Sequence, residues 1–218
     1  MMCYSCDSVC RWRQYHWLVA NPKKIGTYLD LNLQGRFMLT EQKLIEIGDA
    51  LCTLGKQVQK TIIEDTRQIS IPFDSIRLDQ PIEELADLAR WIGSRTKAQY
   101  LYRMTVSDAK LLPELRSAFA SAKEQKDDGR AYARLQEESE TLYVGSSKSL
   151  MSRIKQHLGL GPKRTYAMQI SHWLPNTAGL LYIQAWRFSD DAPPAVVQAI
   201  EDGLWSMTKP MFGRQGAR

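Results

Sequence analysis

The sequence predicts a mixed α+β protein in which helices alternate with a few strands. Three runs rich in aromatic and β-branched residues favour strands, namely AQYLYRMTV, TLYVG and GLLYIQAWRF. Several longer runs place apolar residues at helical spacing. With 218 residues, of which 44% are hydrophobic, the chain is large enough for one domain, or for a small domain with an appendage.

The first clear helix is expected to follow Thr40, which is a suitable N-cap. Apolar residues recur after it at intervals of three and four, and we expect the helix to run toward Asp65. The apolar positions are Leu44, Ile47, Leu51, Leu54 and Val58. The next run, ISIPFDSIRL, alternates and contains Pro72, which favours a short extended segment or an edge strand.

A second helix is well marked in DQPIEELADLARWIGS. Asp79 can act as its N-cap, Pro81 lies near its first turn and Gly93 can end it. We therefore assign residues 1–94 to a mostly helical N-terminal extension of unknown role. Its two helices could mediate a homodimer or fill the core. The balanced charge of this extension favours contact with protein over contact with DNA.

The remaining residues, 95–218, hold the three strand-like runs. An insertion at about 107–140 separates the first two, and its two helical patterns predict a helical hairpin. After TLYVG we expect a turn and a helix over 150–158. The run TYAMQISHWLP is ambiguous, with helix preferred, and a last helix starts at APPAVV and ends before Pro210.

The net charge of +5 comes from the last third of the chain. Up to Leu142 there are 20 Lys and Arg against 20 Asp and Glu, whereas from Tyr143 onward there are 9 against 4. A local basic excess suits a face that binds a polyanion, because each Lys or Arg near a phosphate can release a counterion. A basic, solvated surface without a partner accounts for this excess equally well.

The stretch TLYVGSSKSLMSRIKQHLG places several chemically useful residues close together. Gly145 lets the backbone turn without a Cβ clash, and the SSKS turn offers hydroxyls and backbone N–H groups to an anion at a helix start. On that helix Arg153 and His157 are four residues apart and share a face. A planar guanidinium suits a phosphate, and an imidazole can move protons near neutral pH.

This stretch resembles the second half of the GIY-YIG nuclease domain. Tyr143, Val144 and Gly145 stand where the family has Tyr-Ile-Gly. Arg153 matches the family's catalytic arginine on the following helix, and His157 matches the histidine that often lies one turn later.

The resemblance extends over residues 97–213. Glu201 matches the glutamate that binds the divalent metal, and its helix ends in Lys209 and Pro210, followed by Phe212, as the family's helix does. The resemblance implies a small, mainly antiparallel central sheet of about three strands flanked by helices.

Two positions depart from the family pattern. The first motif falls on AQYLYRM, which keeps the tyrosine but neither the Gly nor the Ile; we assign it to Tyr100, with Tyr102 as the alternative on the same strand face. The family's late Asn is absent, Gly213 lies near its place, and Gln215 either takes its role or the role is dropped.

The resemblance implies a metal-dependent endonuclease that hydrolyses phosphodiester bonds, in DNA more than in RNA, with one Mg²⁺ or Mn²⁺. Restriction, repair and mobile-element biology are all settings for such an enzyme. The predicted catalytic residues are Tyr100, Tyr143, Arg153, His157 and Glu201, with Glu201 as the metal ligand. The predicted nucleic-acid-binding residues are Ser146, Ser147, Lys148, Lys155, Lys163, Arg164 and Arg214.

Other interpretations of the same residues stay open. The tyrosines can simply fill a core, and Glu201 can be one more acid on a helix surface. A non-catalytic nucleic-acid-binding protein and a protein-interaction module on the same scaffold are the alternative function classes.

The N-terminal residues carry a weaker zinc signal. Cys3, Cys6, Cys10 and His16 could ligate zinc, but their spacing matches no standard module, so we expect reduced thiols. The start of the chain lacks the apolar region of a secretory signal, and no apolar run is long enough for a membrane span. We therefore expect an intracellular, cytoplasmic protein.

Overall fold

The computed structural model describes residues 39–78, 81–95, 98–125 and 129–216. Backbone contacts divide the chain into two compact units, Met1–Leu44 and Ile45–Arg218. The expectations for the N-terminal cysteines and for the Asp79 cap lie outside the described residues. No helix in the described part of the chain is long and apolar enough to cross a membrane.

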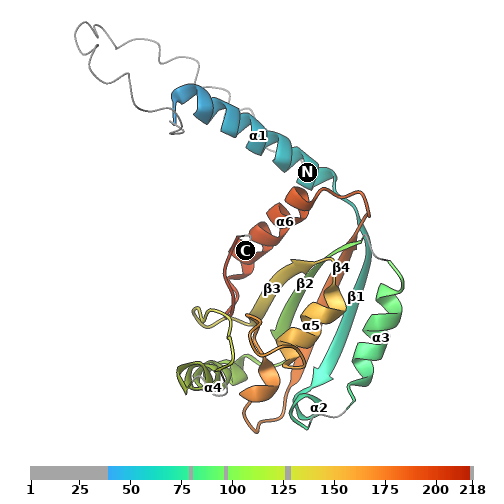
Figure 1. The fold of residues 1–218 in the computed structure, drawn as a ribbon, viewed down its shortest axis with the longest axis vertical. Coiled ribbons are helices and arrows are strands. Elements are labelled where there is room, and N and C mark those ends of the chain that lie inside the picture. Colours follow the sequence, from blue (N-terminus) through green and yellow to red (C-terminus); the bar gives the residue numbers. More distant parts are fainter. Residues whose placement is uncertain (1–38, 79–80, 96–97, 126–128, 217–218) are drawn as a thin grey trace, which may run out of the picture. The chain divides into compact units, whose positions relative to one another are not determined.

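Four strands form one antiparallel sheet within the unit Ile45–Arg218 (Figure 1). They lie in the order β1-β4-β2-β3, and every neighbouring pair is antiparallel. Their bounds are β1 Ile63–Pro72, β2 Gln99–Val106, β3 Thr141–Ser147 and β4 Leu180–Phe188. The mixed α+β class is confirmed, but the expectation of about three strands is wrong, because the extended run around Pro72 becomes a full edge strand.

Six α-helices accompany the sheet in the described residues: α1 Glu41–Lys60, α2 Phe73–Arg77, α3 Glu83–Ile92, α4 Leu112–Gln125, α5 Leu150–Leu158 and α6 Pro194–Thr208. The first predicted helix ends at Lys60 rather than near Asp65, because β1 begins at Ile63. None of the residues of α1 is buried. By contrast, α3 buries Leu85 and Leu88 and contacts β1, so this helix fills the core. Both β1 and α3 therefore belong to the sheet unit, although the sequence assigns them to an N-terminal extension.

The two faces of the sheet carry different helices. Side chains alternate along β2, so Tyr100, Tyr102 and Met104 point to one face and Leu101 to the other. The first face packs in the main core with residues of α3 and α5. Leu101 packs in a separate cluster that includes Val197 of α6. The candidate site is lined by residues of β2, β3, α5 and α6. Of these two helices, α6 contacts β2 and β3, and α5 contacts β3.

The insertion between β2 and β3 is helical only in its first half. The 3-10 turn Ala109–Leu111 and α4 form the expected first arm, whereas residues 129–140 are irregular, so the expectation of a second helical arm is wrong. Backbone hydrogen bonds to distant loops replace the helix. The N–H of Ala133 donates to the Ala167 carbonyl at 2.9 Å, and the N–H of Gln136 donates to the Met211 carbonyl at 2.8 Å.

The run TYAMQISHWLP is not the expected helix, and only the 3-10 turn Ile170–His172 is helical. The backbone before it is left-handed at Gln169, with φ 52°. The buried amide of Gln169 donates to the carbonyls of Ala131 and Lys163, at 2.7 and 3.1 Å. A buried polar side chain thus ties this loop to the insertion.

Candidate active site

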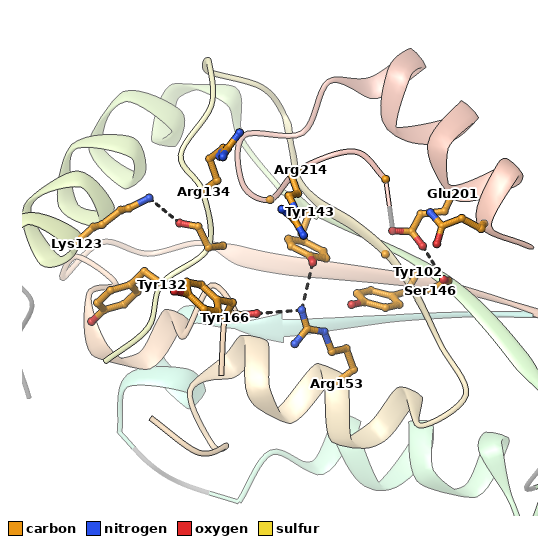
Figure 2. A pocket seen from close by; sticks show the side chains of 15 residues that line it. Tyr102, Lys123, Tyr132, Arg134, Tyr143, Ser146, Arg153, Tyr166, Glu201 and Arg214 are labelled. Atoms are coloured by element: carbon orange, nitrogen blue, oxygen red, sulfur yellow. Dashed lines mark hydrogen bonds between the residues drawn. The ribbon is translucent and has the colours of Figure 1, made fainter. Parts of the chain in front are cut away.

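One cavity of about 940 Å³ is lined by most of the side chains that could act on a substrate (Figure 2). Its walls come from β2, β3, α5, α6, the insertion and the C-terminal segment. The lining residues are Tyr102, Lys123, Tyr132, Ala133, Arg134, Tyr143, Gly145, Ser146, Arg153, Tyr166, Gln198, Glu201, Gly213, Arg214 and Gly216.

A pair of tyrosines forms the floor of this cavity. Tyr102 of β2 and Tyr143 of β3 lie on adjacent strands, and their rings stack at a centroid distance of 6.0 Å and an interplanar angle of 11°. The residues are 1% and 7% exposed, so a substrate must enter the cavity to reach their hydroxyls.

Gly145 makes room for this pair. It lies within β3, opposite Tyr102 in the strand register. A Cβ at this position would lie 2.7 Å from the Tyr102 hydroxyl oxygen and 2.9 Å from Cε1 of Tyr143. The glycine is therefore required by the close approach of two rings, and not by the turn that follows, as the sequence suggested.

His157 lies behind the tyrosines and is fully buried. Its Nε2 is 3.0 Å from the Tyr102 hydroxyl oxygen, and its Nδ1 accepts a hydrogen bond from the Met168 backbone N–H at 3.3 Å. Because a backbone N–H can only donate, Nδ1 has no proton in the neutral ring and Nε2 carries it. Nε2–H therefore donates to Tyr102. This arrangement favours stabilisation of a Tyr102 phenolate by His157 and disfavours acceptance of the Tyr102 proton.

The pKa of the Tyr102 hydroxyl is raised well above its ordinary value. Burial is the main cause, and the neighbouring Tyr143 adds to it, while the positive charge of Arg153 opposes it. Tyr102 is therefore a neutral phenol at neutral pH in the protein alone.

Arg153 reaches the cavity from α5 and touches the tyrosine pair. Its Nη2 donates to the Tyr143 hydroxyl at 3.3 Å and to the Tyr166 carbonyl at 3.1 Å, while its Nη1 donates to the Gln156 side chain at 2.8 Å. Burial by itself would lower the pKa of Arg153, but the two tyrosine hydroxyls outweigh this effect and the pKa is raised. The guanidinium therefore keeps its charge beside the tyrosines.

Glu201 enters the same cavity from α6. Its Oε2 accepts a hydrogen bond from the Ser146 hydroxyl of β3 at 2.5 Å. Figure 2 shows this pair on the opposite side of Tyr143 from Lys123 and Arg134. The cavity thus has an acidic side and a basic side.

The acidic side offers few ligands for a metal ion. The described residues contain no group of three or more His, Cys, Asp and Glu side chains that could hold a metal by themselves. Glu201, with the Ser146 hydroxyl and the nearby Gln198 side chain, provides hard oxygen donors around one carboxylate. This set fits Mg²⁺, which often binds through one or two carboxylates together with water and substrate phosphate.

Tyr100, the first choice for the motif tyrosine, lies away from the cavity. Its ring packs edge-on against Trp91 of α3, with a centroid distance of 5.6 Å. Its hydroxyl is buried without a hydrogen-bond partner among the described residues, and burial raises its pKa against the opposing charge of Arg187. The structure brings Tyr102, the alternative choice, together with Tyr143, Arg153, His157 and Glu201.

The predicted nucleic-acid-binding residues are only partly gathered at the cavity. Ser146 and Arg214 line it. Ser147 accepts a hydrogen bond from the Ser149 N–H in the turn before α5. The other four are exposed and outside the lining, namely Lys148, Lys155, Lys163 and Arg164. The SSKS turn is therefore not the centre of the cavity, contrary to the expectation of an anion site there.

The insertion contributes four lining residues, and sequence reasoning predicted none of them at the site. Lys123, Tyr132 and Arg134 form one wall, and Lys123 donates to the Ala133 carbonyl at 3.0 Å. The basic residues of this segment can be seen in the sequence. The expected helical hairpin, however, gave no reason to place them at the site.

The segment after Pro210 approaches Tyr143 without the family's asparagine. A Cβ on Gly213 would lie 3.0 Å from Cε2 of Tyr143, so the glycine allows a close approach. Gln215 donates to the Asp202 carbonyl and the Ser206 hydroxyl, at 3.2 and 2.8 Å, and does not line the cavity. Gln136 of the insertion instead donates to the Gly213 carbonyl at 2.8 Å.

In comparisons with known proteins, no family model, no curated protein and no solved structure matches this chain.

Proposed function

We propose that this protein is a metal-dependent endonuclease of the GIY-YIG type that hydrolyses phosphodiester bonds in DNA. The observation that carries the proposal is the convergence of four side chains on one cavity. Tyr102 and Tyr143 come from adjacent strands, Arg153 from α5 and Glu201 from α6. Together they offer a water-orienting hydroxyl, a fixed positive charge and a carboxylate for a metal, which are the groups this hydrolysis uses.

Arg153 binds the scissile phosphate in this scheme. Its contacts to Tyr143 and Tyr166, at 3.3 and 3.1 Å, are long enough to be exchanged for shorter, charge-assisted bonds to a phosphate oxygen. The retained charge then neutralises the negative charge that develops as water attacks phosphorus. Tyr143, which is held by the same guanidinium, orients the phosphate and the attacking water.

Tyr102 takes the proton of the attacking water. Because its pKa is raised in the protein alone, the phenol must first pass its own proton to solvent water in the cavity, as cations gather around the hydroxyl. His157 Nε2–H then donates to the phenolate oxygen and stabilises it. The water oxygen forms the new bond to phosphorus, the bond to the leaving oxygen breaks, and the water proton passes to Tyr102.

Glu201 would hold the metal, with Ser146 fixing the orientation of its carboxylate. When bound, a divalent cation supplies Lewis-acid stabilisation of the leaving oxygen and lowers the pKa of neighbouring hydroxyls. The full set of ligands requires the substrate phosphate and water, because the described residues contribute one carboxylate at the cavity.

The proposal is tested by nicking of supercoiled plasmid DNA with Mg²⁺, Mn²⁺ or EDTA. We expect cleavage with either metal and none with EDTA, and we expect Glu201→Gln and Arg153→Ala each to abolish it while the circular dichroism spectrum is unchanged. Glu124→Gln, at an exposed acid of α4 outside the cavity, is the matched control and should cleave normally. Full activity of the Glu201 or Arg153 variant would reject the site.

The low exposure of Tyr102 supports a second candidate, a nucleic-acid-binding protein without catalysis. In that case the basic side of the cavity would bind DNA and the stacked tyrosines would only support its floor. Salt-sensitive binding without cleavage across several metals and substrates would favour this function over hydrolysis.

A further inference from the structure

The wall that the insertion adds to the cavity is basic and aromatic. Four lining residues are cations, Lys123, Arg134, Arg153 and Arg214, against the single carboxylate of Glu201. In Figure 2 the side chains of Lys123, Tyr132 and Arg134 lie on one side of Tyr143, while Ser146 and Glu201 lie on the other. With a volume of about 940 Å³, the cavity has room for more than one phosphate.

The cations of this wall and of the C-terminal segment form no ion pair with a carboxylate of the described residues. Arg134 and Arg214 are exposed and make no ion pair with any described residue. Lys123 is half-buried, and burial together with the nearby charge of Arg134 lowers its pKa. An anion bound between these side chains would relieve the repulsion between like charges.

The backbone fixes the wall in place. The N–H of Gly213 donates to the Arg134 carbonyl at 2.8 Å, and the N–H of Ala133 donates to the Ala167 carbonyl at 2.9 Å. Phe119 of α4 packs edge-on against Tyr132, with ring centroids 5.6 Å apart. These contacts hold this part of the insertion in place as one side of the cavity.

An aromatic side chain lies beside the reacting groups. Tyr166 is 65% exposed and lines the cavity, and its carbonyl accepts the hydrogen bond from Arg153. The exposed ring of this residue, whose backbone carbonyl binds the Arg153 guanidinium, offers a surface for stacking an unpaired base, which does not require a particular sequence.

The depth of the cavity favours one strand over two. The hydroxyls of Tyr102 and Tyr143 belong to residues that are 1% and 7% exposed, so the phosphate must enter the cavity to reach them. A single strand can bend into this space. An intact duplex is stiff over about 150 base pairs and presents its phosphates on a convex surface.

We propose that the insertion and the C-terminal segment form a second phosphate-binding subsite, in which Lys123, Arg134 and Arg214 hold the phosphate next to the scissile one and Tyr166 stacks an unpaired base. The substrate is then a nucleic acid that is single-stranded around the cut. This inference rests on the proposed function, because the cavity is taken to be the site of phosphodiester hydrolysis.

The test measures binding without catalysis. Fluorescence anisotropy in EDTA compares a short labelled single strand with a duplex of the same sequence, across a series of salt concentrations. The variants are Arg134→Ala and Tyr166→Ala, and the control is Lys110→Ala, at an exposed cation of the insertion that does not line the cavity.

We expect the wild-type protein to bind the single strand more tightly than the duplex. Arg134→Ala should reduce the slope of log K against log salt concentration by about 0.7, the value for one phosphate contact on a single strand. Tyr166→Ala should weaken binding of the single strand roughly tenfold, as expected for one lost stacking contact. Lys110→Ala should bind as the wild type does.

Two results would overturn the inference: equal affinity for duplex and single strand, or an unchanged salt slope in Arg134→Ala. The proposed function fails separately. If the subsite variants behave as expected but no metal supports cleavage of any substrate, hydrolysis is rejected while the strand-binding subsite stands.

Discussion

At the scale of single residues, the site depends on the space left by one glycine. The stacked rings of Tyr102 and Tyr143 approach Gly145 so closely that a Cβ would meet both of them at under 3 Å, at distances of 2.7 and 2.9 Å. A methyl group there must push one ring out of the stack, because both belong to a packed core.

Gly145→Ala should therefore lower both stability and cleavage. Overpacking of this kind costs about 1–3 kcal/mol. The measurements are the thermal midpoint and the plasmid nicking rate. Gly203→Ala is the matched control, because its added Cβ meets no atom within 4 Å and alanine is favoured in a helix. Normal activity and an unchanged midpoint in Gly145→Ala would show that the ring pair is not constrained as described.

Sequence reasoning placed the first tyrosine on the strand that lines the cavity, but its first choice, Tyr100, does not line the cavity, whereas Tyr102 does. Tyr100 and Tyr102 share a face of β2, so periodicity could not separate them. The choice is made by the neighbouring helices, because α3 brings Trp91 to Tyr100 and α5 brings His157 to Tyr102. Such contacts between distant elements cannot be read from the local pattern of the sequence.

At the scale of elements, a small polar cluster joins β1, α3 and β4. Asp65 accepts hydrogen bonds from the Trp91 indole N–H at 2.8 Å and from Arg187 at 2.9 Å. The indole bond is the main cause of the lowered pKa of the Asp65 carboxyl, followed by the Thr66 backbone N–H, and Arg187 adds to it. This cluster does not line the cavity. Its hydrogen bonds attach the edge strand β1 to α3 and β4.

Asp65→Asn should destabilise the protein at neutral pH and make no difference in acid. A carboxyl with a lowered pKa adds stability above its ordinary value near 4, and this stability is lost as the pH falls through the lowered value. Urea unfolding at several pH values measures the difference between variant and wild type. The difference should shrink below about pH 4.

Asp49→Asn, at an exposed aspartate of α1, serves as the control for this comparison. A difference between Asp65→Asn and wild type that stays constant from neutral pH into acid would contradict the assigned role of the carboxyl.

The helices and strands with strong patterns were predictable, and the irregular segments were not. The α5 helix and the β4 strand lie where the sequence predicts them. Residues 130–140 and 165–175 were expected to be helical, but tertiary hydrogen bonds to Gln169, Ala167 and Met211 fix them in irregular conformations. Sequence periodicity cannot report a backbone group that is satisfied by a distant loop.

At the scale of the whole molecule, the position of the positive charge was foreseen only in part. The excess after Tyr143 includes Arg153 and Arg214 at the cavity, but Lys123 and Arg134 come from the part of the chain whose charges cancel. The described acidic residues near them in the sequence do not line the cavity. A count of charges along the sequence therefore adds together charges that the fold separates. The meeting of Glu201 with the tyrosines, expected from the resemblance, is present in the structure.

The central claim is that the hydroxyl of Tyr102, and not that of Tyr100, takes part in metal-dependent hydrolysis. The most direct measurement compares plasmid nicking rates with Mg²⁺ for Tyr102→Phe and Tyr100→Phe, two variants that each lose one buried hydroxyl from the same strand face. We predict that Tyr102→Phe slows cleavage by about 10²–10⁴-fold, the range for loss of a general base, while Tyr100→Phe cleaves as the wild type does. Normal cleavage by Tyr102→Phe, or its loss in Tyr100→Phe, would contradict the claim.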